Sequence, residues 1–467
     1  MEADLTSPSG EGYRRLSLWW DGLPGQIGLR APLPGDLDVD VAVVGGGFTG
    51  LWTAFYLSEA DPSLRIVVLE RDVVGFGASG RNGGWCSALF AVSEERLNRV
   101  TGSGTGAAMR RAMEETVREV GRVVAAQRIE CGFVPGGTVS MARTPAQWQR
   151  TRDEVAAARA LGIGEDDLRL LSAEEASAMV AATHVLGGTY TPHCAAVDPA
   201  RLVRGLAEVV ERRGVTVYEQ TAVRVVHPGS VETSRGTVKA ATVVRATEGY
   251  TRTLLGEERT LVPVYSLMIA TEPLPDAFWA EAGLARRETF ADHRHMIIYG
   301  QRTADGRMAF GGRGAPYHFG SAIHAAFERD GHVHESLHQT LIELFPAIAD
   351  ARITHRWGGP LGIARDWFPS VGLDRSTGVA WAGGYVGDGV STTNLAGRTL
   401  SDLILGQDTD LTRLPWVGHR SKRWEPEPLR FVGINAGLRL AGSADRAEER
   451  SGRPTWHSQA LERLVGG

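Results

Sequence analysis

Lysine is almost missing from this sequence of 467 residues. Of the 50 basic residues, only Lys239 and Lys422 are lysines, so arginine supplies nearly all of the positive charge. A mechanism that forms a Schiff base would therefore have to use one of these two side chains. The formal net charge of −5 gives no reason to expect a nucleic acid or an anionic lipid surface as a partner.

Cysteine is scarce as well. Cys86, Cys131 and Cys194 are too widely spaced for a disulfide framework or a zinc cluster, so neither disulfides nor a metal site is predicted. Buried thiols in a reducing compartment are the expectation. Cys86 is the one candidate for a redox or covalent role, because it lies close to a glycine-rich loop at residues 75 to 84.

Long apolar runs are lacking too. No segment approaches the length of a membrane-spanning helix. Residues 1 to 12 are polar and acidic, which predicts neither a signal peptide nor an anchor, and a cytoplasmic location is therefore expected. With 43% hydrophobic and 22% charged residues, the composition is typical of a globular protein with two or more cores.

Glycine, in contrast, is abundant, and three glycines form a nucleotide-binding pattern. An apolar strand ending at residue 44 runs into Gly45, Gly47 and Gly50, spaced as GxGxxG, and then into a helix that begins near Thr49; Phe48 and Thr49 join the cofactor-contacting candidates. The first glycine allows a tight turn, the second lets the backbone approach phosphates, and the third lets the helix pack closely on the sheet. The pattern predicts a pyrophosphate at the helix N-terminus.

An acidic residue completes this pattern. The second strand, residues 65 to 70, ends in Glu70, twenty residues after Gly50, where a carboxylate can bind ribose hydroxyls. Arg71 follows and joins the cofactor-contacting candidates. Strand, turn, helix, strand and acid together predict a bound dinucleotide, and a glycine turn without a ligand is the remaining alternative.

The rest of the chain alternates between two kinds of pattern. Strands and helices of the α/β type return after residue 195 and again toward residue 405, whereas residues 261 to 313 are rich in strands with an Asp-Gly turn. We therefore predict an α/β fold with an α+β second domain. Its parts are an N-terminal arm (1–36), a discontinuous Rossmann-like dinucleotide-binding domain (37–90, 195–255, 355–412), an antiparallel-sheet substrate domain (91–194, 256–354) and a C-terminal tail (413–467).

Several ordered motifs resemble those of the FAD-dependent D-amino acid oxidase, glycine oxidase and sarcosine oxidase family. Within it, the sequence is most similar to bacterial amine oxidoreductases of the γ-glutamylputrescine oxidase kind. The similarity covers roughly residues 15 to 410. Its motifs are VVGGGFTGL (43–51), Glu70, GASGRNGG (77–84), VDPARL (197–202), EQTAV (219–223), VVRAT (243–247) and AGGYVGDG (382–389), with WEPEPLR (424–430) typical of a bacterial subgroup.

The resemblance implies FAD as the cofactor. It places Gly45, Gly47 and Gly50 at the pyrophosphate, Glu70 at the adenosine ribose and Val223 at the adenine. It also implies that a loop runs beside the isoalloxazine ring, formed by Ala78, Ser79, Gly80, Arg81, Asn82, Gly83 and Gly84. A second helix N-terminus, formed by Gly384, Gly387, Gly389 and Val390, would reach the pyrimidine edge. A helix dipole there stabilises the negative charge of reduced flavin.

Two departures from the family pattern matter. The sarcosine branch attaches its flavin through a late cysteine and activates oxygen with a lysine. Here residues 357 to 360 contain no cysteine and residues 307 to 313 contain no lysine. Non-covalent FAD is therefore expected, and either oxygen or another electron acceptor remains open.

Candidates for substrate binding come from the strand-rich region and from the loop of residues 78 to 84, which we call the ring loop. They are Arg81, Asn82, Tyr265, His295, Tyr299, Arg313 and Trp357. Arg313 is suited to a substrate carboxylate, with a solvated arginine as the alternative. His293 and His295 are expected on one face of a strand. Metal binding by this pair is disfavoured because no third ligand is evident.

The sequence thus favours oxidation of the C–N bond of a small amine or amino acid. Hydride passes to flavin N5, and the resulting imine hydrolyses in water. The alternatives are a flavin-dependent dehydrogenase of a 2-hydroxy acid and a protein that binds FAD without turnover.

Overall fold

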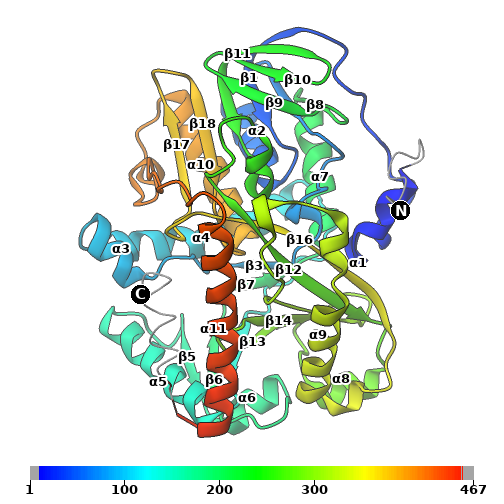
Figure 1. The fold of residues 1–467 in the computed structure, drawn as a ribbon, viewed down its shortest axis with the longest axis vertical. Coiled ribbons are helices and arrows are strands. Elements are labelled where there is room, and N and C mark those ends of the chain that lie inside the picture. Colours follow the sequence, from blue (N-terminus) through cyan, green and yellow to red (C-terminus); the bar gives the residue numbers. More distant parts are fainter. Residues whose placement is uncertain (1–9, 454, 456–467) are drawn as a thin grey trace.

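Two eight-stranded sheets organise the chain (Figure 1). The computed structural model describes residues 10–453 and 455. The first sheet occupies the upper part of Figure 1 and the second sheet the lower part. A third, two-stranded sheet of β3 (Trp85–Ser87) and β7 (Cys194–Ala196) accompanies them. The arrangement confirms the predicted α/β architecture with a second, mainly antiparallel sheet.

The first sheet has the order β17-β18-β11-β1-β2-β8, and β9 and β10 extend it as a hairpin from β11. Pairings of β1 with β2 and β11, and of β11 with β18, are parallel. Its strands are β1 (Leu37–Val44), β2 (Ile66–Leu69), β8 (Thr216–Tyr218), β9 (Val223–His227), β10 (Ser230–Thr233), β11 (Gly236–Arg245), β17 (Ser370–Asp374) and β18 (Val379–Gly383).

Strand β1 is apolar on both faces because both faces are covered. Val41 and Val43 join a core formed with the helices, whereas Ala42 and Val44 join a second core formed with the β9–β10 hairpin. Such continuous apolar runs are expected for central parallel strands. The covering helices are α2 (Phe48–Ala60), α3 (Glu94–Thr101), α4 (Thr105–Ala126), α7 (Pro199–Arg212) and α10 (Gly389–Leu405).

The second sheet has the order β16-β12-β15-β14-β13-β4-β6-β5 and is antiparallel except between β13 and β4. The predicted Asp-Gly turn joins β14 to β15, and Gly306 has the positive φ of 75° that such a turn requires. Its strands are β4 (Thr138–Ala142), β5 (Arg169–Leu171), β6 (Gly187–Thr191), β12 (Val262–Thr271), β13 (Thr289–Asp292), β14 (Ile298–Arg302), β15 (Met308–Gly312) and β16 (Ile353–Ile363).

Four further helices pack around this second sheet: α5 (Pro145–Ala160), α6 (Ala173–Met179), α8 (Asp276–Ala282) and α9 (Gly331–Leu344). A capping box formed by Ser172 and Glu175 starts α6, with both reciprocal hydrogen bonds present. Asp198 caps α7 and Pro199 occupies its first turn.

Three predicted boundaries need correction. Strand β16 pairs with β12 along its length, so the return to the first sheet comes after Ile363 and not at residue 355. Helices α3 and α4, within the segment predicted for the substrate domain, contribute to the core of the first sheet. The predicted strand at His295 begins only at Ile298, because residues 293 to 297 form an irregular connection.

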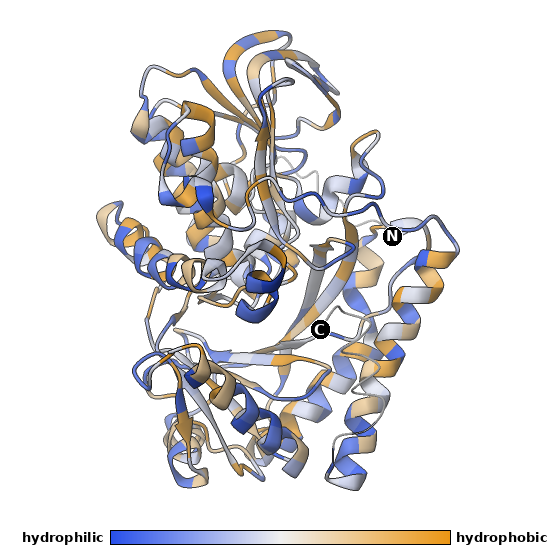
Figure 2. Cartoon of the chain, turned by 90° about the vertical axis from the view of Figure 1, so that its left-hand side faces the viewer, coloured by the Kyte–Doolittle hydropathy of each residue, from blue (hydrophilic) through white to orange (hydrophobic). Residues whose placement is uncertain are grey.

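The described parts of the N-terminal arm and the C-terminal tail pack on the body. In the arm, short α1 (Leu18–Asp21) buries Trp19 and Trp20. The tail contains helix α11 (Leu429–Ser451). Apolar and polar residues alternate along α11 in Figure 2. Among the described helices, none combines the length and apolarity that crossing a membrane requires.

Candidate functional site

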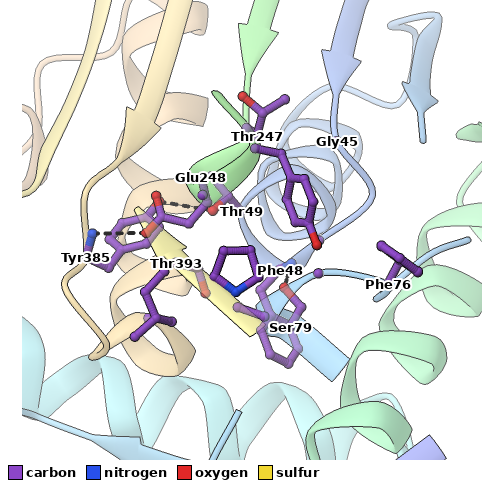
Figure 3. A pocket seen from close by; sticks show the side chains of 18 of the residues that line it. Gly45, Phe48, Thr49, Phe76, Ser79, Thr247, Glu248, Tyr385 and Thr393 are labelled. Atoms are coloured by element: carbon purple, nitrogen blue, oxygen red, sulfur yellow. Dashed lines mark hydrogen bonds between the residues drawn. The ribbon is translucent and has the colours of Figure 1, made fainter. Parts of the chain in front are cut away.

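One cavity gathers most of the predicted cofactor residues (Figure 3). It lies where β1, β2 and β11 end, between the glycine turn, the ring loop and the start of α10. Predicted residues that line it are Gly45, Gly47, Phe48, Thr49, Glu70, Arg71, Ala78, Ser79, Asn82, Val223, Gly387, Gly389 and Val390. The remaining predicted cofactor residues, Gly50, Gly80, Arg81, Gly83, Gly84 and Gly384, stand in or next to the same segments without lining it.

The glycines of the turn are required by close contacts. Gly45 has a φ of 111°, and a Cβ there would lie 2.5 Å from the carbonyl oxygen of Ala246. A Cβ at Gly50 would collide with the carbonyl oxygen of Gly45. A Cβ at Gly47 would lie 2.9 Å from Ser79 Oγ, so the absence of a side chain at residue 47 lets the ring loop pack closely on the turn. The turn therefore has the open backbone cradle that a pyrophosphate needs.

Glu70 ties the end of β2 to this turn. Its Oε2 accepts from the backbone N–H of Gly46 at 2.8 Å, and its Oε1 accepts from that of Asp72 at 2.9 Å. Burial raises the pKa of Glu70 to about 7, and the two backbone hydrogen bonds oppose this rise. The carboxyl group lines the cavity, in the position where a ribose would be held.

The start of α10 is held against the turn by two residues that the sequence analysis misses. The hydroxyl of Tyr385 lies 3.0 Å from that of Thr49 (Figure 3). Glu248 accepts from the backbone N–H groups of Gly384 at 2.9 Å and Tyr385 at 3.3 Å. Burial raises the pKa of Glu248 to about 7. An acid three residues beyond the apolar strand β11 was the available signal.

The ring loop is braced by Asn82. Its Nδ2 donates to the carbonyl oxygens of Ala78 at 3.0 Å and Ser79 at 3.1 Å, and its Oδ1 accepts from the N–H of Gly84 at 2.8 Å. Ser79 Oγ in turn accepts from the N–H of Phe48 at 2.9 Å, which joins the loop to the first turn of α2. The polar atoms of Asn82 thus shape the loop.

Tyr299 lies against the far end of the loop. A Cβ at Gly83 would lie 2.7 Å from the Tyr299 ring, so only a glycine fits at residue 83. The Tyr299 hydroxyl is 2.8 Å from Ser266 Oγ. Gly84, at a φ of 71°, packs in the same way on Gln301, whose Nε2 donates to the Gly83 carbonyl oxygen at 2.6 Å.

Arg313 reaches the loop before α10. Its Nη2 donates to the carbonyl oxygen of Val386, and its guanidinium lies over Trp367, 5.7 Å from the ring centroid. Burial lowers the pKa of Arg313, and the nearby Asp388 opposes this effect. Burial raises the pKa of Asp388 to about 6, and Arg313 opposes that rise. A half-buried cation and a half-buried anion thus flank the segment that starts α10.

Apart from Asn82, the predicted substrate residues, Tyr299 and Arg313 included, are not among the described residues that line this cavity. Trp357 is buried, and its Nε1 donates to the Arg81 carbonyl oxygen at 2.9 Å, so it supports the loop from behind. The hydroxyl of Tyr265 accepts from the N–H of His324 at 3.2 Å within the second core. Tyr265 lies on β12 and Trp357 on β16, and both side chains pack against protein and not against the cavity.

The histidine pair belongs to a contact with α11. His295 Nε2 lies 3.1 Å from Glu448 Oε1, and its N–H donates to Asp445 at 2.7 Å. The carbonyl oxygen of His293 accepts from Arg150 Nη2 at 2.7 Å. The period-of-two argument fails here because these residues lie outside a strand. We find His295 fastening the tail, not facing the cavity.

The three cysteines are free and buried. None is among the described residues that line the cavity. Burial raises the pKa of Cys86 well above its ordinary value, which opposes formation of a reactive thiolate.

Comparison with known proteins agrees with this geometry. Residues 40–403 match the family described as FAD dependent oxidoreductase (DAO). The probable oxidoreductase OrdL of Rhizobium meliloti is 29% identical over 416 residues, covering 87% of this chain and 92% of that protein. The gamma-glutamylputrescine oxidoreductase of Escherichia coli is 28% identical over 405 residues, covering 82% and 89%.

Solved structures share the fold. Glycine oxidase from Geobacillus kaustophilus superposes with a TM-score of 0.67 at 21% identity and covers 82% of this chain and 99% of its own. L-Amino acid deaminase from Proteus myxofaciens gives a TM-score of 0.65 at 17% identity, with coverages of 84% and 95%.

Proposed function

The chain belongs to the FAD-dependent oxidoreductase (DAO) family, and on this premise we propose that it oxidises the C–N bond of a small amine or amino acid. One observation carries the proposal: the N-termini of α2 and α10 meet at a single cavity, beside the ring loop. The first helix end suits a pyrophosphate, and the second suits the charge of a reduced ring. We assign cofactor binding to the first sheet and substrate binding to the second.

The substrate class rests on relatives and on the charge of one half-buried arginine. Relatives of this chain include a gamma-glutamylputrescine oxidoreductase, and its structural neighbours include a glycine oxidase and an amino acid deaminase. Arg313 is half-buried beside the 386–388 loop, and only its Nη2 has a hydrogen-bond acceptor among the described residues. We propose that its remaining donors bind a substrate carboxylate.

When bound, FAD supplies the acceptor for the hydride that leaves the carbon next to nitrogen. The chain supplies position and electrostatics. Arg313 orients the substrate, Gly83 lets the loop pack directly against the Tyr299 ring, and the start of α10 offers its positive end. The oxidised product, an imine, takes up water and releases a carbonyl compound and an amine or ammonia.

The electron acceptor and the compartment complete the proposal. Oxygen or another carrier accepts the electrons, and measuring oxygen uptake against dye reduction separates the two. The three free thiols favour a reducing compartment, and we propose the cytoplasm.

The test is anaerobic bleaching of the purified yellow protein by a panel of amines, amino acids and 2-hydroxy acids. The proposal expects bleaching by an amine or amino acid. Bleaching by hydroxy acids alone would establish the dehydrogenase alternative. A flavin that chemical reductants bleach and no substrate bleaches would indicate a protein that binds FAD without turnover.

A further inference from the structure

Arg81 holds a guanidinium that is engaged from three sides. Its Nη1 forms an ion pair with Glu328 Oε2 at 2.7 Å, and its Nη2 donates to the hydroxyl oxygen of Tyr250 at 2.9 Å. The guanidinium also lies over Phe76, 5.0 Å from the ring centroid. The side chain is 1% exposed. Arg81 is therefore committed to protein partners, whereas the sequence places it at the substrate.

Tyr250 differs from Arg81 because it lines the cofactor cavity. Its hydroxyl oxygen accepts from Arg81, and among residues 10–453 and 455 no acceptor is within hydrogen-bond distance of its hydroxyl hydrogen. Tyr250 is half-buried, and a phenol group largely removed from water normally donates as well as accepts. Burial raises the pKa of Tyr250, so the hydroxyl keeps its hydrogen.

The orientation of this hydroxyl follows from the chemistry of arginine. A guanidinium has five donors and no acceptor, so the side of the Tyr250 oxygen that faces Arg81 must accept. The hydrogen is thereby turned away from Arg81. An oxygen that accepts from a cation is also polarised, which strengthens its O–H as a donor.

We propose that Tyr250 contacts the cofactor directly by donating its hydroxyl hydrogen to an oxygen atom of FAD, and that Arg81 is a positioning residue that orients this donor. The inference relies on the family's cofactor and is independent of the substrate. It replaces the substrate role that the sequence predicts for Arg81.

Arg81 is held in position by elements of the second sheet and its surroundings. Glu328 comes from the short helix η5 (Ala325–Arg329), which precedes α9. On β16, a Cβ at Gly359 would lie 3.5 Å from Arg81 Cζ, so the guanidinium packs against the strand at a glycine. The next two residues, Pro360 and Leu361, line the cavity. The elements around the second sheet, to which we assign substrate binding, thus also orient the Tyr250 hydroxyl through Arg81.

The test is the dissociation constant of FAD, measured by flavin fluorescence on the full chain after removal of flavin. Tyr250→Phe removes only the hydroxyl, and binding about tenfold weaker is expected. Arg81→Met should cause a similar loss. The double variant should bind about as well as either single variant, because Arg81 acts through Tyr250. Arg81→Lys keeps a donor and should restore part of the affinity.

Tyr190→Phe is the matched control. The Tyr190 hydroxyl also accepts from an arginine, Arg286, at 3.3 Å, but it donates to the Gly136 carbonyl oxygen at 3.2 Å and lies on β6. Its FAD constant should stay within about twofold of that of the unaltered chain.

Two results would overturn the inference. A folded Tyr250→Phe variant with an unchanged FAD constant removes the direct contact. If the losses of FAD affinity in the two single variants add up in the double variant, Arg81 does not act through Tyr250. Both are read without substrate, so a failure of the proposed C–N oxidation would leave them unaffected.

Discussion

The side-chain oxygens of Thr49 and Tyr385 lie 3.0 Å apart, although 336 residues separate them in the sequence. Thr49 stands in the first turn of α2, and Tyr385 precedes α10 by four residues. The contact joins two helix N-termini at one cavity. Both positive helix ends therefore act on whatever fills it, which suits an anionic dinucleotide and its reduced ring.

The acid at the end of β2 should govern cofactor affinity. Glu70→Ala removes a charged acceptor of a ribose hydroxyl, and FAD binding about tenfold to a hundredfold weaker is expected. Glu70→Gln keeps an acceptor for the Gly46 N–H and should lose less. Equal FAD constants for both variants and the unaltered chain would show that another residue holds the ribose.

Cofactor-free protein should lose stability as pH rises toward 7. The folded pKa values of Glu70 and Glu248, about 7, lie above the ordinary value of 4.5, so the folded state binds protons more tightly than the unfolded state. Their contribution is present below about pH 4.5 and is lost as pH passes 7, at no more than about 1.4 kcal/mol per pH unit and group.

Glu248→Gln isolates one of these two groups. The amide keeps an acceptor for the N–H groups of Gly384 and Tyr385 but does not titrate. The fall in melting temperature between pH 5.5 and 8 should therefore be smaller than in the unaltered chain. The same fall in both proteins would contradict the raised pKa.

Flavin should leave the protein on denaturation. No cysteine is among the described residues that line the cavity, so acid precipitation should release yellow supernatant. Flavin that stays with the pellet would point to a covalent bond, and peptide mapping around Cys86 would be the next step.

Arg313 should determine preference for carboxylate-bearing substrates. Arg313→Met removes the proposed carboxylate partner, and a loss of about tenfold to a hundredfold in kcat/KM is expected for an amino acid, mainly through KM. Substrates without a carboxylate should be affected far less. Arg302→Met is the control, since Arg302 also stacks on a tryptophan, 4.6 Å from the Trp279 ring centroid. An equal loss with both kinds of substrate would assign Arg313 a structural role.

The first sheet could be predicted from sequence because its signals are local. The turn from Gly45 to Gly50 and the acid at Glu70 are fixed by the short-range geometry of a strand, a turn and a helix, and residues from both line the cavity. The capping box at Ser172 is equally local.

The residues that sequence analysis misplaced depend on distant partners. His295 bonds with Glu448, and Arg81 pairs with Glu328, across long separations in the chain. Glu248 gains its role only because Gly384 folds against it. A pattern of one or two residues carries no information on such pairings. The same holds for a whole strand, because the sequence of β16 did not reveal that it pairs with β12 in the second sheet.

The central claim is oxidation of a C–N bond, and the pH dependence of the anaerobic reductive half-reaction tests it most directly. A free alkyl amine has a pKa of about 10.4, so almost all of it is protonated at pH 7 and cannot lose hydride. Stopped-flow reduction of the flavin is measured from about pH 6 to 9, with ordinary and α-deuterated substrate and again in deuterated buffer. The account predicts a rate that rises with pH and slows with α-deuterium. A rate independent of pH for an amine substrate, or reduction by 2-hydroxy acids alone, would contradict it.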